Sequence, residues 1–403
     1  MNPRDLPDPQ ALTPIQQILL SNISAQAAAL HMPCYLVGGV ARDLLLGKPT
    51  HDLDVIVEGN AIQLGKQLAR AHGGNLTAHP PFGTAIWQPP NAPPLDLITA
   101  RAETYPHPGA LPLVTPSTIE DDLRRRDFTL NALALRVEGG RFSALLDPLH
   151  GQADLAQGII RVLHPRSFMD DPTRIFRAVR YEQRYGFSIE DKTLALINAE
   201  SLQTLAELSG ERIRHELDLI LMEENAALML ARLNALNVLR VFNLPALQND
   251  FFYSSENALP EFETPEKRLS LKYLLWLANL SAEESAAIAQ RLDFNAELRA
   301  ALSALIQMRR ELPRLENSSP SVWTFFLEKF PPLAVYALWL IGKQTALKKF
   351  LTLWRGIKPA MNGNDLKARG VPPGPRYKQI LTRVRAAWLD GELNNAEEEW
   401  RFL

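Results

Sequence analysis

The chain has a single cysteine, Cys34, among its 403 residues. One cysteine excludes an internal disulfide and any zinc site built from several cysteines, which is typical of a reducing compartment. The opening residues, MNPRDLPDPQ, have neither the basic start nor the apolar run of a signal peptide. No apolar stretch approaches the roughly 18 residues of a membrane span. We therefore expect a cytoplasmic protein with no membrane part, in which Cys34 is a small buried hydrophobic residue.

The sequence also lacks a marked excess of charge of either sign. Its formal net charge is −2, so no global basic field indicates a nucleic-acid partner, and any basic patch must be local. The composition is that of a globular protein, with 46% hydrophobic and 22% charged residues. A chain of this length predicts about two to four domains with sizeable cores.

The most informative stretch runs from Tyr35 to Glu58 and reads YLVGGVARDLLLGKPTHDLDVIVE. Its first apolar residues predict a short strand, Gly38-Gly39 predicts a turn, and a helix is expected to start near Val40. Two glycines allow backbone N–H groups to approach an anion closely, and a helix N-terminus favours negative charge. This unit therefore predicts a phosphate-binding turn.

A second strand is expected over 51–57. Asp52 and Asp54 lie two residues apart on it, so both carboxylates leave the same face of the strand. The other face carries apolar residues expected in a core: Leu53, Val55 and Val57. Either motif alone often occurs by chance, since a Gly-Gly turn follows many strands and alternating aspartates are often solvated. Together they predict two Mg²⁺ ions and phosphoryl-type transfer.

Two further strands, 84–88 and 95–100, predict a hairpin across the proline-rich segment QPPNAPP. Asp96 faces away from the apolar side of the second strand and is a candidate third carboxylate. The alternative is an exposed aspartate at a strand end. The segment 101–118 contains four prolines and little periodicity, and it predicts a long loop of the kind that is usually functional or mobile.

The segment 119–135, IEDDLRRRDFTLNALAL, begins charged and ends apolar. Arginine suits phosphate because its planar guanidinium binds two oxygens at once, so Arg124-Arg125-Arg126 is a candidate phosphate-binding cluster. Asp127 and Asn131 are four residues apart and would share one face of a helix, where they could hold a ribose hydroxyl. The alternative is a solvated helix start.

A cationic stripe is predicted on a helix within 170–187. Its members recur at spacings of three, three and four residues: Arg174, Arg177, Arg180 and Arg184. Such a stripe is more often an ion-paired surface than a site. Asp170 and Asp171 precede this helix, where carboxylates also act as N-terminal caps.

The charge becomes strongly basic only over 342–388. This segment contains eleven Lys or Arg residues against one acid, Asp365, which is an electrostatic footprint for a polyanion. Within it, NGNDLKARGVPPGP (362–375) is rich in glycine and proline. We predict RNA contacts from seven of the basic residues: Lys343, Lys348, Lys349, Arg369, Arg376, Lys378 and Arg383.

Five motifs, in this order, resemble those of the class II tRNA nucleotidyltransferases, that is, the CCA-adding enzymes and the related bacterial poly(A) polymerases. They are LVGGVARDLLLG with DLD, RRRDFTLNALAL, DPLHGQADL, DDPTRIFRAVRY and LSGERIRHEL. Together they span 35–217, and 362–375 resembles the tail segment of the family. Residues 226–340 match only in being helical.

The resemblance implies an α+β fold, with a small polymerase-β-like nucleotidyltransferase head followed by an all-helical neck, body and tail. The expected divisions are an N-terminal arm and helix (1–27), the head (28–150), the neck with its base-reading motif (151–225), the body (226–320) and a tRNA-binding tail (321–403).

The resemblance also implies roles for individual residues. Asp52 and Asp54 would hold the Mg²⁺ ions and would form the catalytic carboxylates together with Asp96. The nucleotide-binding positions follow in chain order: Gly38, Gly39 and Arg42 at the triphosphate; Arg125, Arg126, Asp127 and Asn131 at ribose and phosphates; Asp171 and Arg174 at the base; and Arg177 and Arg180 beside them on the same helix.

The pair Asp171 and Arg174 has a chemical basis for reading the base. Cytosine and adenine each present an amino donor beside a ring-nitrogen acceptor, which match a carboxylate and a guanidinium. Guanine and uracil present the reverse pattern and would leave polar groups unpaired. A separation of three residues at a helix start places both side chains on one face. Such a pair can select C and A without a nucleic-acid template.

Two departures from the family pattern matter. Asp170 stands where the family usually has Glu, so the carboxylate that supports Arg174 is one methylene shorter. The segment 101–118 is present in full, whereas CC-only members have it shortened, and in the family this loop helps to switch from C to A addition. A CC-only enzyme is therefore disfavoured, and an A-only enzyme stays open because A-adding relatives share the wording PGALP.

The sequence thus predicts an enzyme that adds CCA to tRNA 3′ ends from CTP and ATP, with tRNA as its partner and no protein partner implied. The alternatives are an A-adding enzyme or a poly(A) polymerase, although the latter typically has a long basic C-terminal extension and this chain ends acidic. A catalytically dead RNA-binding protein is opposed by the intact Asp52, Asp54, Asp171 and Arg174. A small-molecule nucleotidyltransferase is opposed by the base-reading pair and the basic segment.

Overall fold

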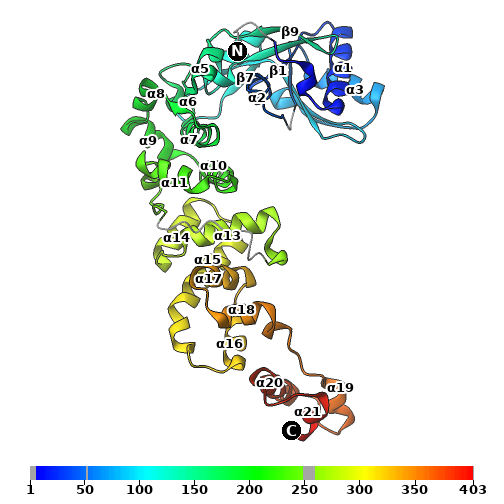
Figure 1. Cartoon of the computed structure of the whole chain (residues 1–403), viewed down its shortest axis with the longest axis vertical. Coiled ribbons are helices and arrows are strands. Elements are labelled where there is room, and N and C mark those ends of the chain that lie inside the picture. The colour runs from blue at the N-terminus through cyan, green and yellow to red at the C-terminus, as the bar shows by residue number, and fades with distance from the viewer. Residues whose placement is uncertain (1–5, 51–52, 248–258, 403) are drawn as a thin grey trace. The chain divides into compact units, whose positions relative to one another are not determined.

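The computed structural model describes residues 6–50, 53–247 and 259–402. The chain folds as two compact units, Met1–Leu208 and Ser209–Leu403, which can be followed by colour in Figure 1. The first unit contains a mixed sheet followed by helices, and the described elements of the second unit are helical. The predicted α+β fold is confirmed.

The sheet of the first unit has the strand order β3-β4-β5-β2-β1-β8-β9. Its strands are β1 (Cys34–Val37), β2 (Asp54–Val57), β3 (Asn75–His79), β4 (Thr84–Gln88), β5 (Leu95–Thr99), β8 (Ala134–Glu138) and β9 (Arg141–Leu146). β2 and β5 run parallel, and the other neighbouring pairs are antiparallel. β4 and β5 form the predicted hairpin, with Trp87 opposite Leu95.

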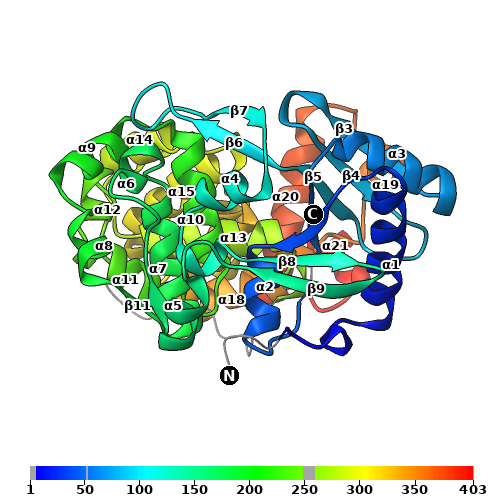
Figure 2. The same cartoon turned by 90° about the horizontal axis from the view of Figure 1, so that it is seen from above.

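One face of the sheet is covered by α1 (Pro14–Ala29) and α3 (Ala61–His72), which lie on the same side in Figure 2. Thr13 caps α1 in a capping box with Gln16, so both side chains satisfy backbone N–H groups at the helix start. The described apolar residues of the second predicted strand are buried as expected: Leu53, Val55 and Val57.

The opposite face of β2 carries Asp54 and Ile56. Ile56 is fully buried in a cluster with Ile119 and Leu123 of α4 (Ile119–Arg124). The end of β2 is therefore covered on both faces, as for a strand in the middle of a sheet. Asp54, at the start of the strand, is only half-buried.

The segment 101–118 is not the loop that its prolines predicted. β6 (Arg101–Thr104) and β7 (Leu113–Pro116) pair as an antiparallel hairpin. The expectation failed because three of the four prolines lie at the tip, and the fourth ends β7, where an edge strand tolerates proline. At the tip, the Gly109 N–H donates to the Met169 carbonyl over 2.9 Å.

The segment 119–135 also departs from its prediction. α4 ends at Arg124, a 3₁₀ turn (η3) covers Thr129–Asn131, and β8 begins at Ala134. The expectation of a helix that places Asp127 and Asn131 on one face was therefore wrong, because the apolar end of the segment is used as a strand against β1. The two side chains nevertheless meet through the turn.

The remaining elements of the first unit are short. The helices are α2 (Gly39–Leu45), α5 (Gly151–Gln157), α6 (Ser167–Asp170), α7 (Arg174–Tyr185), α8 (Asp191–Ala195) and α9 (Ala199–Glu207). β10 (Ile159–Ile160) and β11 (Ser188–Ile189) pair in parallel. Asp154 of α5 is buried and accepts from Thr129 and Arg161, which ties α5 to η3.

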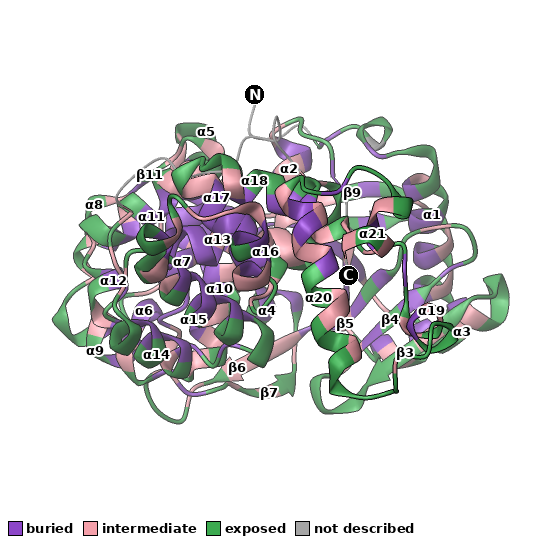
Figure 3. Cartoon of the chain, turned by 90° about the horizontal axis from the view of Figure 1, so that it is seen from below, coloured by how far each residue is buried: buried purple, intermediate pink, exposed green. Residues whose placement is uncertain are grey.

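The second unit is built from twelve α-helices in its described part. They are α10 (Gly210–Met222), α11 (Ala226–Ala235), α12 (Val238–Val241), α13 (Pro265–Leu277), α14 (Ala282–Arg291), α15 (Ala296–Glu311), α16 (Pro320–Leu327), α17 (Pro332–Gly342), α18 (Thr345–Thr352), α19 (Gly363–Ala368), α20 (Pro375–Asp390) and α21 (Ala396–Phe402). Figure 3 shows burial concentrated on α13 and α17. The buried Glu399 of α21 accepts from Trp388 and from the backbone N–H groups of Ala360 and Met361.

Two expectations from the composition can be compared with the structure. None of the described helices combines the length and apolar character needed to cross a membrane. Cys34 is buried on β1, and burial raises the pKa of its thiol to about 12. It therefore packs as a small hydrophobic residue, as predicted.

Candidate active site

A cleft of about 470 Å³ lies in the first unit. Residues from β1, β2, β5, α2, η3, the β6–β7 hairpin and α7 line it. Eleven of the predicted nucleotide or metal positions are among them: Gly38, Gly39, Arg42, Asp54, Arg125, Arg126, Asp127, Asn131, Asp171, Arg174 and Arg177. Positions that are far apart in the chain therefore face one space. Arg180, also predicted, is buried on α7 and is not part of the lining.

The carboxylate edge of the cleft is formed by two parallel strands. Asp54 of β2 is in register with Asp96 of β5, so both side chains leave the same face of the sheet. Asp96 is exposed and is not among the lining residues, whereas Ile98, two residues further along β5, lines the cleft. Asp52 lies outside the described residues. Carboxylate oxygens are the ligands that Mg²⁺ prefers, so this donor set fits the predicted ion.

The described residues alone do not complete a metal cluster. Within 6–50, 53–247 and 259–402, no group of three or more His, Cys, Asp or Glu side chains could hold a metal ion. The metal assignment of Asp52 and Asp54, and the catalytic role of Asp96, stay predictions.

Gly38 forms the predicted turn between β1 and α2. Its φ of 61° is in the region that favours glycine, and a Cβ at this position would lie 2.5 Å from Nη1 of Arg126. The Arg126 guanidinium therefore packs directly over the turn. Two predicted phosphate-binding elements, the glycine turn and the arginine cluster, meet here.

Asp122 organises the arginine cluster and was not predicted as a site residue. Its carboxylate is fully buried. One oxygen accepts from Nε and Nη2 of Arg125 at 2.9 and 2.7 Å, and the other accepts from Arg126 at 3.3 and 3.0 Å. Arg124, by contrast, is exposed. The spacings of three and four residues from Asp122 to Arg125 and Arg126 were the sequence signal that could have predicted these ion pairs.

Arg125 has a second carboxylate partner in the hairpin. Its Nη1 donates to Glu103 at 2.8 Å, and Glu103 also accepts from Tyr105 at 3.1 Å. Glu103 and Tyr105 line the cleft. Burial raises the pKa of Tyr105 to about 12, an effect that Arg174 opposes and Glu103 reinforces. Both residues lay in the segment predicted as a loop, where no pattern singled them out.

Asp127 and Asn131 are part of a hydrogen-bonded chain. Asp127 accepts from Asn131 Nδ2 at 2.9 Å and from Arg177 Nε at 2.8 Å. Asn131 in turn accepts from Arg42 Nη1 at 2.7 Å. Burial raises the pKa of Asp127, but the charge of Arg177 and the hydrogen bond from Asn131 outweigh it and hold the pKa below its usual range. The carboxyl is therefore ionised at neutral pH.

Arg42 is buried and held on several sides. It donates to Tyr185 over 2.6 Å and to Asp43 over 2.9 Å, and its guanidinium lies 4.7 Å from the Tyr185 ring centre. Burial lowers the pKa of Arg42, but the hydrogen bond to Asp43 and the neighbouring charges give a net upward shift. Arg42 is therefore a cation whose position the protein sets in advance.

Asp171 and Arg174 both line the cleft but do not share a helix. Asp171 follows α6 with an extended backbone, whereas Arg174 is the first residue of α7. The expectation that one helix face carries both side chains was wrong, because Pro172 and Thr173 form a turn between Asp171 and Arg174. Asp170 lies 3.7 Å from Arg166 and 3.9 Å from His164, so its charge is directed toward those residues.

The sequence matches two family models and resembles known proteins over nearly its whole length. Residues 34–161 match the model of the poly A polymerase head domain, and residues 186–251 match the probable RNA- and SrmB-binding site of polymerase A. An A-adding tRNA nucleotidyltransferase of Halalkalibacterium halodurans is 34% identical over 95% of this chain and 91% of that protein. The chain belongs to the class II tRNA nucleotidyltransferase family.

Solved structures of this nucleotidyltransferase family resemble the whole chain. An apo CCA-adding enzyme superimposes with a TM-score of 0.80 at 28% identity and covers 98% of this chain and 96% of its own. The Thermotoga maritima CCA-adding enzyme complexed with tRNA gives a TM-score of 0.73 at 27% identity, with the same coverage of both chains.

The predicted RNA-binding residues of this nucleotidyltransferase are all exposed in the second unit. They lie at the end of α17, on α18, at the end of α19 and on α20: Lys343, Lys348, Lys349, Arg369, Arg376, Lys378 and Arg383. Arg369 stacks over Trp400 at 3.8 Å and Arg383 over Phe402 at 5.0 Å. These aromatic rings orient the two guanidinium groups.

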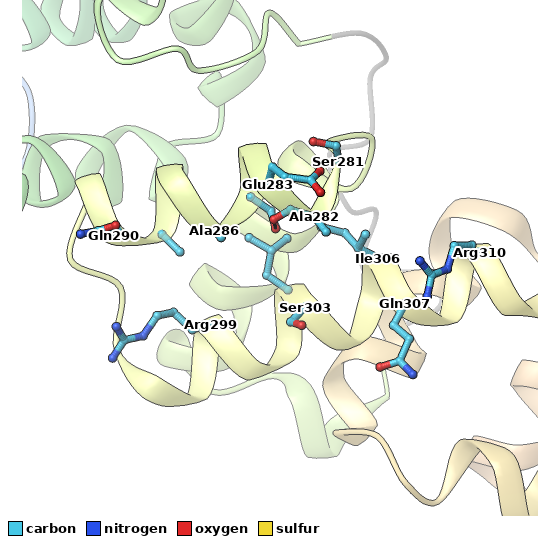
Figure 4. Close-up of a pocket in the computed structure, with 13 residues that line it drawn as sticks. Ser281, Ala282, Glu283, Ala286, Gln290, Arg299, Ser303, Ile306, Gln307 and Arg310 are labelled. Carbon is cyan, nitrogen blue, oxygen red and sulfur yellow. Dashed lines mark hydrogen bonds between the residues drawn. The ribbon is translucent and has the colours of Figure 1, made fainter.

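A larger hollow, of about 840 Å³, lies between α14 and α15 of the second unit. Figure 4 shows Ala286 and Gln290 on α14 and Ser303 and Ile306 on α15. Glu283 is the one carboxylate among its described lining residues. Its described lining therefore offers no carboxylate pair for metal-dependent transfer.

The contact between Gly38 and Arg126 predicts the effect of Gly38→Ala. The new methyl group would displace the Arg126 guanidinium, and we expect nucleotide incorporation to fall by at least about tenfold through a higher KM. Gly47→Ala is a matched control, since Gly47 also has a positive φ but nothing lies within 4 Å of its Cβ position. Equal kinetics in the two variants would contradict this prediction.

The ion pair between the buried Asp127 and the half-buried Arg177 predicts a pH-dependent stability. Asp127→Asn should lower the free energy of unfolding at pH 7 by about 2 kcal/mol, less than for a fully buried pair because Arg177 is half-buried. The folded-state pKa of Asp127 is lowered, so its contribution is present above the ordinary Asp pKa of about 4 and is lost as the pH falls through the folded-state pKa.

Urea denaturation at pH 7 and at successively lower pH measures this difference. The exposed Asp191→Asn serves as the control. A gap between wild type and Asp127→Asn that stays constant into the acid range would show that the charge of Asp127 is not involved.

Proposed function

We propose that this nucleotidyltransferase adds CCA to tRNA 3′ ends from CTP and ATP. The observation that carries the proposal is the shared cleft, in which Asp54, the Gly38-Gly39 turn and the pair Asp171 and Arg174 line one space. Transfer requires a carboxylate edge, a site for the phosphates and a means of reading the base. A single cleft that contains all three supports nucleotide transfer with base selection.

The carboxylates would hold Mg²⁺. Asp54 and Asp96, in register on adjacent strands, would do so together with Asp52. Bound Mg²⁺ would favour ionisation of the tRNA 3′-hydroxyl and neutralise charge on the phosphates. The strands themselves contribute rigidity, because the end of β2 is buried on both faces.

The arginines would bind the triphosphate as an already positioned group. Asp122 holds Arg125 and Arg126, and Asn131 and Tyr185 hold Arg42. A guanidinium that is fixed beforehand loses less freedom when it binds phosphate. Asp127 and Asn131 would contact the ribose from the same hydrogen-bonded chain.

Asp171 and Arg174 would read the base by the hydrogen-bonding pattern that cytosine and adenine share. The carboxylate would accept from the amino group, and the guanidinium would donate to the ring nitrogen. Uracil and guanine would place a carbonyl against Asp171 and an N–H against Arg174, so they would be rejected.

A second candidate function is the addition of the terminal A alone. The relative that is 34% identical over 95% of this chain is an A-adding enzyme, whereas the apo CCA-adding structure is 28% identical. Sequence identity thus favours this candidate, while the donor and acceptor pattern of Asp171 and Arg174 fits both bases. Both candidates use ATP and a tRNA end.

The tRNA would contact the exposed basic residues of the second unit. One of the solved structures that resemble this chain is a CCA-adding enzyme complexed with tRNA, which supports tRNA as the partner. Lys and Arg side chains neutralise backbone phosphates and release counterions, so this contact would be salt-dependent.

The product decides between the two candidates. tRNAs ending at the discriminator, at C and at CC are supplied with CTP, ATP or both, and the products are sequenced. CCA addition requires extension of all three, whereas A addition extends only the tRNA ending in CC. Asp54→Asn should lower either activity at least about a thousandfold. Retained turnover in that variant would overturn the metal assignment.

Charge reversal tests the binding of RNA to the second unit. Lys378→Glu and Arg383→Glu should weaken tRNA binding and reduce the slope of log K against log salt by about 1 for each phosphate that is no longer neutralised. Lys66→Glu, on the exposed side of α3, is a charge-matched control. An unaltered tRNA affinity in both tail variants would show that the RNA site lies elsewhere.

A further inference from the structure

Two buried hydroxyl groups contact the pair Asp171 and Arg174, one for each member. Ser167 is the first residue of α6 and is fully buried, and Thr173 lies in the turn before α7 and is 8% exposed. Neither was singled out by the sequence motifs.

Ser167 holds the guanidinium of Arg174. Its Oγ accepts from Arg174 Nη1 at 2.7 Å, while Nη2 donates to the Arg125 carbonyl at 2.9 Å and lies 3.5 Å from the Tyr105 hydroxyl. Arg174 is 4% exposed. Contacts on both terminal nitrogens fix the plane of the guanidinium, and they use fewer than its five N–H donors.

Thr173 holds the carboxylate of Asp171. Its hydroxyl donates to Asp171 Oδ1 at 2.7 Å, and its backbone N–H donates to the same oxygen at 3.2 Å. Two donors on one oxygen set the rotation of the carboxylate, and they orient its acceptor sites relative to the cleft.

We propose that Ser167 and Thr173 are positioning residues for base selection, an inference that rests on the proposed function of Asp171 and Arg174. Each hydroxyl fixes the direction of one hydrogen bond to the base. Discrimination requires that a mismatched base presents its carbonyl to the carboxylate and its N–H to the guanidinium, so that neither group finds a partner. A pair that could rotate would relieve both mismatches and accept UTP or GTP more readily.

The alternative is that both hydroxyls only stabilise the fold. Ser167 and Thr173 lie at the starts of α6 and α7, where removal of a hydrogen bond would also lower stability. A structural role would lower the yield of active protein or its melting temperature, and it would affect all four nucleotides equally. A positioning role changes the ratio between nucleotides.

The experiment measures kcat/KM for each of the four nucleoside triphosphates on tRNA ends that the wild type extends. Ser167→Ala and Thr173→Val should each lower the ratio of correct to incorrect nucleotide by about tenfold, the equivalent of one hydrogen bond to a charged group. Thr173→Ser keeps the hydroxyl and should restore the ratio.

Matched controls remove a buried hydroxyl away from the cleft. Ser24→Ala removes the group that accepts from the Gly140 N–H, and Thr324→Val removes the group that donates to the Pro320 carbonyl. Both should leave the nucleotide ratio unchanged, whatever they do to the melting temperature.

Arg174→Ala separates the positioning role from base reading itself. A lower ratio in Arg174→Ala with unchanged ratios in Ser167→Ala and Thr173→Val would overturn the positioning role alone. An unchanged ratio in Arg174→Ala would instead overturn base reading by this pair. If Ser167→Ala does not fold, the comparison of Thr173→Val with Thr173→Ser still decides the case for Thr173, and an unchanged ratio there overturns the proposal.

Discussion

The candidate site depends on pairing half-buried guanidinium groups with buried carboxylates. Asp122 holds Arg125 and Arg126, and Asp127 holds Arg177. A charge that leaves water is stable in a protein only when partners and hydrogen bonds replace its hydration. These carboxylates therefore allow a concentration of positive charge in one cleft, and they set the direction of each guanidinium before a nucleotide binds.

The same contacts join elements that are distant in the sequence. A series of side-chain hydrogen bonds runs from Arg177 through Asp127, Asn131 and Arg42 to Tyr185. It therefore leaves α7 and returns to it by way of η3 and α2. The β6–β7 hairpin is tied to α6 by the backbone hydrogen bond between Gly109 and Met169. A displacement of α7 would therefore also move Arg42 beside the glycine turn, because an unbroken series of hydrogen bonds connects the two.

Local patterns predicted the elements that have a strong period or a clear boundary. The strand with Val55 and Val57 and the hairpin that contains Asp96 were expected close to where the structure has them. The β6–β7 hairpin was missed because neither strand alternates apolar and polar residues. Asp127 and Asn131 were expected on a helix, but the apolar residues that follow them form β8, which pairs with β1, so no helix continues through this segment.

The sequence by itself determined the chemistry on offer: alternating aspartates, a glycine turn, clustered arginines and an Asp-Arg pair, in an order that identified the family. Only the tertiary structure decided which of these groups meet and what holds them. The register of β2 against β5 sets Asp54 beside Asp96, and Ser167 orients Arg174, which it contacts only in the folded protein. Hydrogen bonds act over about 3 Å, so spacing along the chain cannot specify them.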